Sequence, residues 1–213
     1  MKNVSIKCAV VGLIFGSMLV MNVQAEGMVF FRGAWSHMSG DRGGEVFTDT
    51  ADGLGEGTGK NDSNNGFAVG AGLDTDLDFK LLFGDVLGEI FIEYSEFSRN
   101  EVLQTTSALL GGDNKSKVTV NQLSVIVAPK LQWEVATDLR TWVIPVGLGF
   151  LVSSPPSDNT AVLDLGLHFG AGVDYVVYGP IVVGADVRYT LGFERQDTES
   201  SYLSVGAYTG IKF

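Results

Sequence analysis

The sequence has very few residues that cross-link a fold or interrupt a strand. Cys8 is the only cysteine among 213 residues, and it lies in a segment that we expect to be removed, so the mature chain can form no disulfide. Proline is rare, at 5 residues, whereas glycine is common, at 28. After residue 25, no apolar run is long enough to cross a bilayer as a helix. Something other than disulfides or spanning helices must therefore hold the fold.

Basic residues are also scarce. The chain has 14 Lys and Arg against 25 Asp and Glu. The first 25 residues hold two of the lysines and no acid, so the remainder carries 12 basic and 25 acidic residues, a net charge of −13. This balance argues against nucleic acid as a partner and against docking of a polybasic patch on anionic lipid.

The N-terminus has the pattern of a secretory signal peptide. Two lysines precede an apolar run at residues 9–20, and Val23-Gln-Ala25 has the small residues that a signal peptidase reads, with cleavage expected before Glu26. The apolar run is short for a membrane anchor, which needs about 20 residues. We therefore predict a cleaved signal peptide over residues 1–25 and one domain over residues 26–213.

The rest of the chain alternates between apolar and small or polar residues with the period of two that is typical of β-strands. In the clearest run, leucine, phenylalanine, valine and tyrosine share one face, and glycine, aspartate and histidine share the other. In the fifth run we place Trp142 and Ile144 on the apolar face with Val146, although Pro145 makes this register the least secure. Eight strands are predicted, at residues 28–39, 66–76, 87–98, 118–132, 141–152, 163–175, 181–191 and 202–213.

The connections between these strands alternate in length. The long and polar ones follow the first, third, fifth and seventh strands, at residues 40–65, 99–117, 153–162 and 192–201. The others are short, at residues 134–140 and 176–180, or intermediate, at residues 77–86. Outer-membrane barrels place long loops outside the cell and tight turns in the periplasm. Both chain ends are then expected on the periplasmic side.

The apolar faces of these strands suit lipid better than a protein core. A secreted β-sandwich or a soluble ligand-binding barrel has the same alternation, but its interior would be crowded with bulky side chains from all eight strands. Its outer face would be rich in glycine and poor in the Lys, Glu and Thr that cover a wet surface. An eight-stranded lumen is just wide enough to be filled by side chains, which suits the Gly-rich face. Aromatic residues near strand ends, among them Trp35, Tyr94, Trp133 and Trp142, are typical of interfacial girdles.

Four segments carry a resemblance to a known family: Met28-Val-Phe-Phe-Arg-Gly-Ala34, residues 143–150, residues 170–175 and the terminal Tyr208-Thr-Gly-Ile-Lys-Phe213. The chain resembles the small eight-stranded outer-membrane barrels, namely the OmpA-type transmembrane domain and its porin-family relatives. The resemblance implies an all-β, eight-stranded antiparallel up-and-down transmembrane β-barrel in the bacterial outer membrane, surrounded by lipid. It also implies that the last strand, with Ile211 and Phe213, is the signal read by the assembly machinery, and that no periplasmic peptidoglycan-binding domain follows.

The inward faces of the predicted strands carry charged and polar side chains: Arg32, Glu89, Glu93, Asp164, His168, Asp174, Asp186, Arg188 and Lys212. We interpret them as a network of ion pairs that satisfies these groups and largely plugs a narrow lumen. The predicted role is then structural, or interactive through exposed acidic loops at the cell surface. The alternative is a small channel for ions or small solutes, in which the same pairs would control passage.

A third hypothesis is a lipid A-modifying enzyme built on His168, with Asp164 four residues away on the same face. Such an enzyme needs a nucleophile or water beside a base and its orienting acid. No paired serine motif stands out, although His37 lies beside Ser36 and near Ser39. We therefore expect neither enzymatic activity nor a cofactor.

Two acidic stretches supply carboxylates outside the network. Residues 49–65 have the oxygen ligands that hard cations prefer, but not the spacing of an EF-hand. We expect a solvated loop there, which leaves open weak Ca²⁺ binding or a cationic partner. Asp74, Asp76 and Asp78 form the second stretch, and we expect a solvated patch at a periplasmic turn.

Overall fold

The computed structural model describes residues 26–40, 57–61, 64–82, 84–103, 115–154, 163–193 and 200–213. The predicted signal peptide, residues 1–25, and most of the acidic stretch 49–65 lie outside these residues. No helix in the described part of the chain is long and apolar enough to cross a membrane. The strands are β1 (Gly27–Met38), β2 (Gly57–Asn61), β3 (Asn65–Leu81), β4 (Gly84–Leu103), β5 (Lys115–Ala136), β6 (Leu139–Ser154), β7 (Asp164–Tyr178), β8 (Ile181–Gly192) and β9 (Tyr202–Lys212).

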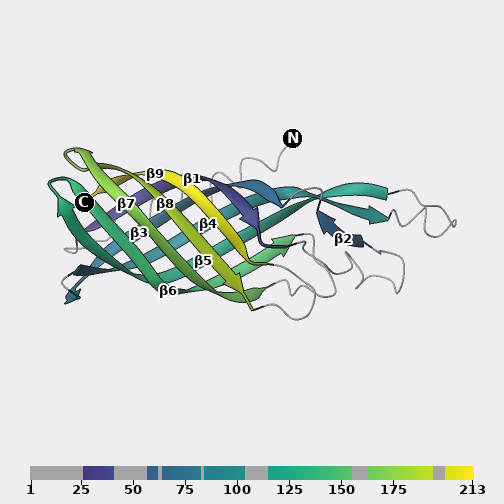
Figure 1. Cartoon of the computed structure of the whole chain (residues 1–213), viewed down its shortest axis with the longest axis horizontal. Helices are drawn as coiled ribbons and strands as arrows, with labels where there is room; N and C mark the ends of the chain where they lie inside the picture. The colour runs from purple at the N-terminus through teal and green to yellow at the C-terminus, as the bar shows by residue number, and fades with distance from the viewer. Residues whose placement is uncertain are drawn as a thin grey trace, which may run out of the picture.

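Eight of these strands close into a barrel. Around the ring they follow the order β4, β3, β1, β9, β8, β7, β6 and β5, and β5 pairs with β4 to complete the wall. Every pairing is antiparallel. Among the described residues, the short β2 pairs only with the far end of β4, at Asn100 and Val102, and is not part of the ring. Figure 1 shows the strongly tilted strands of this barrel, and the predicted architecture is confirmed.

Tight turns gather at the end of the barrel that holds the C-terminus (Figure 1). Asp138 in the β5–β6 turn has a φ of 65° and Gly179 in the β7–β8 turn has a φ of 54°. Both are left-handed conformations, which Gly adopts freely and Asp tolerates better than most residues. The backbone N–H of Lys212 donates to Pro180 O at 2.9 Å, which ties the last strand to this end. We refer to it as the periplasmic end.

The link between β3 and β4 is shorter than the sequence suggested. We expected a connection over residues 77–86, but β3 continues to Leu81 and β4 begins at Gly84. The β3–β4 ladder is irregular between Asp76 and Lys80. Within this irregularity Asp78 has a φ of 56° and its N–H donates to Asp76 Oδ1 at 2.8 Å. The bulge lets the strand bend and carry on, so the acidic stretch that we interpreted as a turn belongs to a strand.

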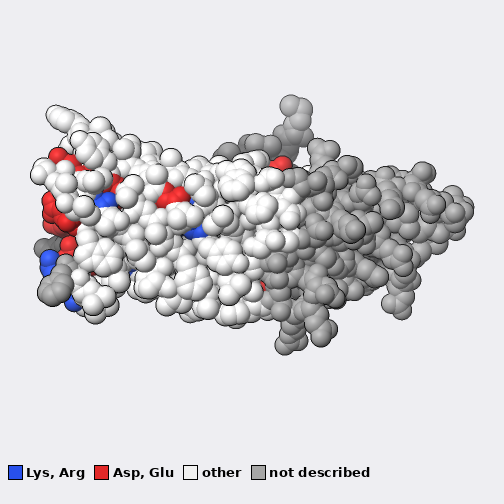
Figure 2. Space-filling model, viewed as in Figure 1, with Lys and Arg blue, Asp and Glu red and all other residues white. Residues whose placement is uncertain are grey.

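The outer wall of the barrel is apolar. Large side chains on every strand of the ring point outward and are exposed, including Phe31, Val69, Ile90, Val127, Leu148, Leu165, Val187 and Ile211. Figure 2 shows an outer surface that is mostly uncharged, with a few acidic and basic atoms partway along the barrel and most of them at the periplasmic end. The alternate residues on the same strands are buried inside. This distribution is that of a transmembrane barrel, because a soluble barrel would have its apolar faces inside.

The first half of β6 faces the opposite way from the prediction. Trp142 and Ile144 are buried in the lumen, whereas Pro145 and Val146 are both exposed. The β6–β7 ladder is irregular between Ile144 and Gly147, so the alternation slips by one residue there. Proline has no N–H to give to the ladder, which makes this a natural place for a bulge. Trp142 is therefore a lumen residue and not part of an aromatic girdle.

Candidate functional site

The lumen is crossed at mid-height by a pair of charges from opposite walls. Arg188 on β8 donates to Glu89 on β4 through both terminal guanidinium nitrogens, at 2.5 Å for Nη1–Oε1 and 3.2 Å for Nη2–Oε2. Three strands separate β4 from β8 in either direction around the ring. Both side chains are fully buried. A bidentate pair therefore spans the barrel across its width.

Arg32 on β1 extends this arrangement to a third wall. Its Nη1 pairs with Glu93 on β4. Its Nε donates to Asp186 Oδ1 on β8 at 2.7 Å, and Asp186 Oδ2 in turn accepts from Arg188 Nε at 3.0 Å. Two arginines and three carboxylates thus form one connected group, and each charge in it has a partner of opposite sign.

Lys130 and Asp74 complete the group, and neither was among the predicted network residues. Lys130 Nζ lies 2.7 Å from Asp74 Oδ2 and 3.3 Å from Glu89 Oε2. Asp74, which we expected in a solvated patch, is only 2% exposed because it precedes the bulge at Asp76 and still points into the lumen. The sequence did indicate that Lys130 faces inward. It lies an even number of residues from Gln122, Ser124 and Ile126, which are all on the inward face of β5.

Aromatic rings fill the space around these cations. Arg188 Cζ lies 4.4 Å from the centroid of the Phe91 ring, and Lys130 Nζ lies 4.2 Å from that of Trp142. Phe30 stacks on Phe91 with a centroid distance of 5.7 Å. Cation–π contacts strengthen when they are desolvated. We call the set Arg32, Asp74, Glu89, Glu93, Lys130, Asp186 and Arg188, with Phe30, Phe91 and Trp142, the plug.

Below the plug, toward the periplasm, Asp174 on β7 collects several donors. Tyr208 Oη and Trp142 Nε1, the latter at 3.2 Å, donate to its Oδ1. Gln132 Nε2 at 2.9 Å and Arg140 Nη2 at 3.2 Å donate to its Oδ2. Four strands, β5, β6, β7 and β9, are joined through these contacts, so the lower half of the lumen is also cross-connected.

Above the plug, Tyr202 spans the lumen. Its hydroxyl bonds Glu93 Oε1 at 3.1 Å and Ser124 Oγ at 3.0 Å. Its ring packs with Met38, Phe97 and Val120 in a second apolar cluster. Asp164, a predicted network residue, lies beyond this level, where it is half-buried and accepts from Ser200 Oγ at 2.8 Å.

The structure does not bring His168 and Asp164 together. His168 is buried, and its Nδ1 lies 2.9 Å from Thr190 Oγ1. Its Nε2 has no hydrogen-bond partner in the part of the chain that the structure describes. His37, the other histidine, contacts Asn65 Oδ1 at 3.1 Å and stacks on Trp35. The acid, base and nucleophile of the third hypothesis are therefore not assembled around His168 by the described residues.

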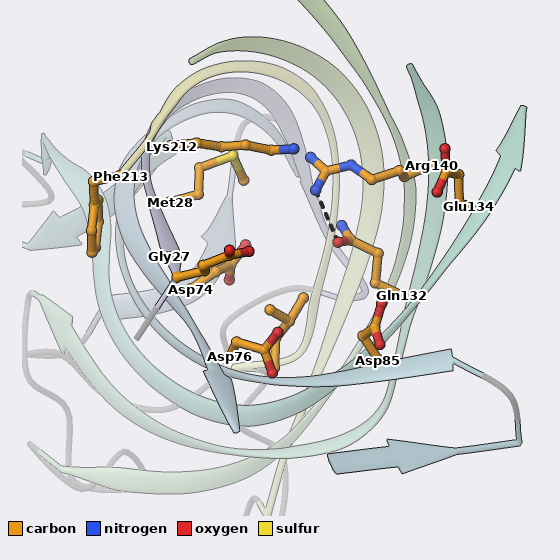
Figure 3. Close-up of a pocket in the computed structure, with 12 residues that line it drawn as sticks. Gly27, Met28, Asp74, Asp76, Asp85, Gln132, Glu134, Arg140, Lys212 and Phe213 are labelled. Carbon is orange, nitrogen blue, oxygen red and sulfur yellow. Dashed lines mark hydrogen bonds between the residues drawn. The ribbon is translucent and has the colours of Figure 1, made fainter. Parts of the chain in front are cut away.

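A pocket of about 480 Å³ opens at the periplasmic mouth of the lumen. Its floor includes the buried Met28, Asp74 and Leu87. Its sides carry charged residues, among them Arg140 and Lys212, the last of the predicted network residues (Figure 3). Lys212 is thus half-buried at the mouth and lies outside the plug. We call this pocket the vestibule.

No protein-family model matches this chain, and no curated protein sequence matches it. Its structure is similar to that of Ail, the attachment invasion locus protein of Yersinia pestis, solved with the heparin analogue sucrose octasulfate (TM-score 0.47, 14% identity, 90% of this chain and 100% of that chain). It is also similar to the outer membrane protein OprG from Pseudomonas aeruginosa (TM-score 0.49, 14% identity, 88% and 96%). A third similar structure is the outer membrane enzyme PagL (TM-score 0.45, 14% identity, 85% and 98%). Because these values are low, the class of this protein rests on its own geometry.

That geometry combines a closed ring of eight antiparallel strands, an apolar outer band and a polar lumen. Only a barrel surrounded by lipid has this arrangement, since every backbone group in the membrane must find its partner within the wall. The chain is a small eight-stranded bacterial outer-membrane β-barrel.

Proposed function

We propose that this barrel is a closed membrane anchor that presents its long loops at the cell surface, and that it does not conduct ions. The observation that supports the proposal most strongly is the Arg188–Glu89 pair, which joins opposite walls at 2.5 Å in a fully buried setting. Phe91 and Trp142 occupy the space beside it. A path for ions through the lumen would have to pass this level.

Opening such a path is energetically unfavourable. Leaving one member of a buried ion pair without its partner costs about 3–5 kcal/mol. In the plug, Glu89 serves both Arg188 and Lys130, so moving it would leave two cations with fewer partners. Tyr202 above and Asp174 below would also have to give up their contacts across the lumen. Spontaneous opening is therefore expected to be rare.

Single-channel recording in planar bilayers tests the proposal. The wild-type barrel should give no defined conductance steps, whereas the double variant Glu89→Ala/Arg188→Ala should give frequent openings. The matched control is Lys80→Ala/Asp85→Ala, which removes an exposed pair of 2.9 Å at the periplasmic end and should stay silent. Regular ohmic steps from the wild-type protein would refute a closed anchor and favour the small-channel hypothesis.

The proposal includes an assembly role for the last strand. Phe213 pairs with Gly27 through both backbone groups, at 3.0 and 3.2 Å, so it supports the seam between β9 and β1. The side chains of Ile211 and Phe213 are exposed on the outer wall, where an assembly factor could read them. Deleting Phe213 should lower the amount of heat-modifiable barrel in the outer membrane. Unchanged levels in that variant would argue against a terminal signal.

We further propose that the barrel is not a lipid A-modifying enzyme. The hydrogen-bond partner of His168 is Thr190, and His168 is buried in the lumen, away from the apolar outer wall that lipid contacts. Overexpression of the wild-type protein should leave the mass spectrum of lipid A unchanged. A new lipid A species that disappears in His168→Ala would overturn this. Weak Ca²⁺ binding or a cationic partner at residues 49–65 stays a prediction, which calorimetric titration with CaCl₂ would check.

A further inference from the structure

The two basic residues of the vestibule lie together. In Figure 3, Lys212 and Arg140 point toward each other, with Glu134 beside Arg140, while Asp74, Asp76 and Asp85 lie lower in the view. The plug closes the lumen above, so the vestibule is a blind pocket that opens to the periplasm. Small-molecule sites typically have a volume of about 300–1,000 Å³, and the vestibule falls within that range at about 480 Å³.

On the basic side, Arg140 has a carboxylate partner, Asp174, but Lys212 has none among the described residues. Arg140 uses Nη1 for Gln132 Oε1 at 3.1 Å and Nη2 for Asp174 Oδ2 at 3.2 Å, and its Nε has no hydrogen-bond partner. Within the described part of the chain, Lys212 Nζ has no carboxylate at ion-pair distance. Two cations that face each other repel, and an anionic group placed between them would remove that repulsion.

On the acidic side, one carboxylate oxygen of Asp74 lacks a hydrogen-bond donor among the described residues. Asp74 is 2% exposed, and its Oδ2 is held by Lys130 at 2.7 Å, but its Oδ1 has no hydrogen-bond partner. A buried carboxylate oxygen without a donor is unfavourable. Asp76, which also lines the vestibule, adds negative charge on the same side. An ammonium group supplies three N–H donors and the complementary charge.

We propose that the vestibule binds a small zwitterion with an ammonium and a carboxylate, that is, an amino acid or a short peptide. The ammonium would face Asp74 and Asp76, and the carboxylate would lie between Arg140 and Lys212. A bare metal ion fits this site less well, because no three His, Cys, Asp or Glu side chains of the described residues converge to hold one. Binding requires no passage through the plug, so the inference does not depend on whether the barrel conducts.

Titration of the refolded barrel with three dipeptide derivatives tests the proposal. Glycylglycine has both charges, N-acetylglycylglycine lacks the ammonium, and glycylglycinamide lacks the carboxylate. Isothermal calorimetry should show saturable binding of glycylglycine and at least about fivefold weaker binding of each blocked form, which corresponds to the loss of one exposed ion pair. Absence of saturable glycylglycine binding would overturn the proposal. Equal binding of glycylglycinamide would also overturn it, because the acidic side alone would then account for binding.

Two pairs of variants locate the site. Lys212→Gln and Asp76→Asn should each weaken glycylglycine binding by about fivefold. Their matched controls, Lys80→Gln and Asp78→Asn, change the same residue types at the same end but do not line the vestibule. Asp78→Asn should bind like the wild type, and Lys80→Gln, which frees the vestibule residue Asp85 from its ion pair, should not weaken binding. Lys212→Gln should also distinguish glycylglycine from glycylglycinamide less well than the wild type, because only Arg140 then remains to bind the carboxylate. Equal losses in variants and controls would place binding elsewhere and contradict the proposal. Heat-modifiable gel mobility confirms that each variant is folded.

Discussion

The plug and the vestibule lie in the same lumen but differ in how far their charged side chains form ion pairs. In the plug, Arg32, Lys130 and Arg188 each contact at least one carboxylate at 2.5–2.7 Å. In the vestibule, Lys212 has no ion-pair partner among the described residues, and Asp74, which the plug and the vestibule share, is paired through one oxygen with Lys130 but keeps the other without a donor. Paired charges connect the walls of the barrel, whereas charges without a full set of partners can bind a ligand. Pairing, and not the mere presence of charge, therefore separates the structural part of this lumen from its candidate binding part.

The comparison predicts that removing a plug charge has the largest effect. Arg188→Ala leaves Glu89 buried without its main partner and takes one donor from Asp186, which keeps Arg32, so it should lower the free energy of unfolding by about 3–5 kcal/mol. Urea unfolding of barrels refolded into lipid vesicles, followed by tryptophan fluorescence, measures this. The control Lys80→Ala removes an exposed pair and should cost less than about 1 kcal/mol. Equal costs for the two variants would mean that the plug does not stabilise the barrel.

A smaller effect is expected where a glycine lets an aromatic ring lie against the wall. A Cβ on Gly184 would lie 2.5 Å from Tyr208 Oη, so Gly184→Ala should displace the ring and its bond to Asp174. Overpacking of this kind costs about 1–3 kcal/mol. Gly33→Ala is the matched control, since nothing lies within 4 Å of its added Cβ. If both variants unfold at the wild-type urea concentration, the packing described for Tyr208 is wrong.

The smallest effect on stability is expected in the vestibule. Lys212→Gln breaks no ion pair of the described structure and should change the free energy of unfolding by no more than about 0.5 kcal/mol. The same urea titration measures it. A loss comparable to that of Arg188→Ala would show that Lys212 belongs to the plug, and the contrast between the two regions would fail.

The sequence is sufficient to predict the barrel, because alternation over eight segments survives small errors at strand ends. It also indicates which residues face inward, since parity along a strand is a local property: Arg32, Glu89 and Arg188 all follow it. The slip in β6 could not be located, because Pro145 signals a disturbance without saying on which side the alternation shifts. In the same way, the bulge after Asp76 turned an expected loop into a strand and left Asp74 inside the lumen.

Which side chains pair across the lumen is harder to predict than which face of its strand a residue occupies. Glu89 and Arg188 are 99 residues apart, and which side chains share a level depends on the tilt and stagger accumulated over every strand between them. A slip in one strand changes that sum for all the following strands. Lys130 is an example. The alternation along β5 places it on the inward face, but its pairing with Asp74 and Glu89 can be seen only once all eight strands are arranged in the ring.

The measurement that tests the account most directly is a double-mutant cycle on Glu89 and Arg188. Glu89→Ala, Arg188→Ala and the double variant would be unfolded in urea from lipid vesicles alongside the wild type. The account predicts that the two single losses exceed the loss in the double variant by a coupling energy of about 1.5 kcal/mol or more, as for close, desolvated charge pairs. Losses that add to within about 0.5 kcal/mol would contradict it, because the two side chains would then not act as one bridge across the lumen.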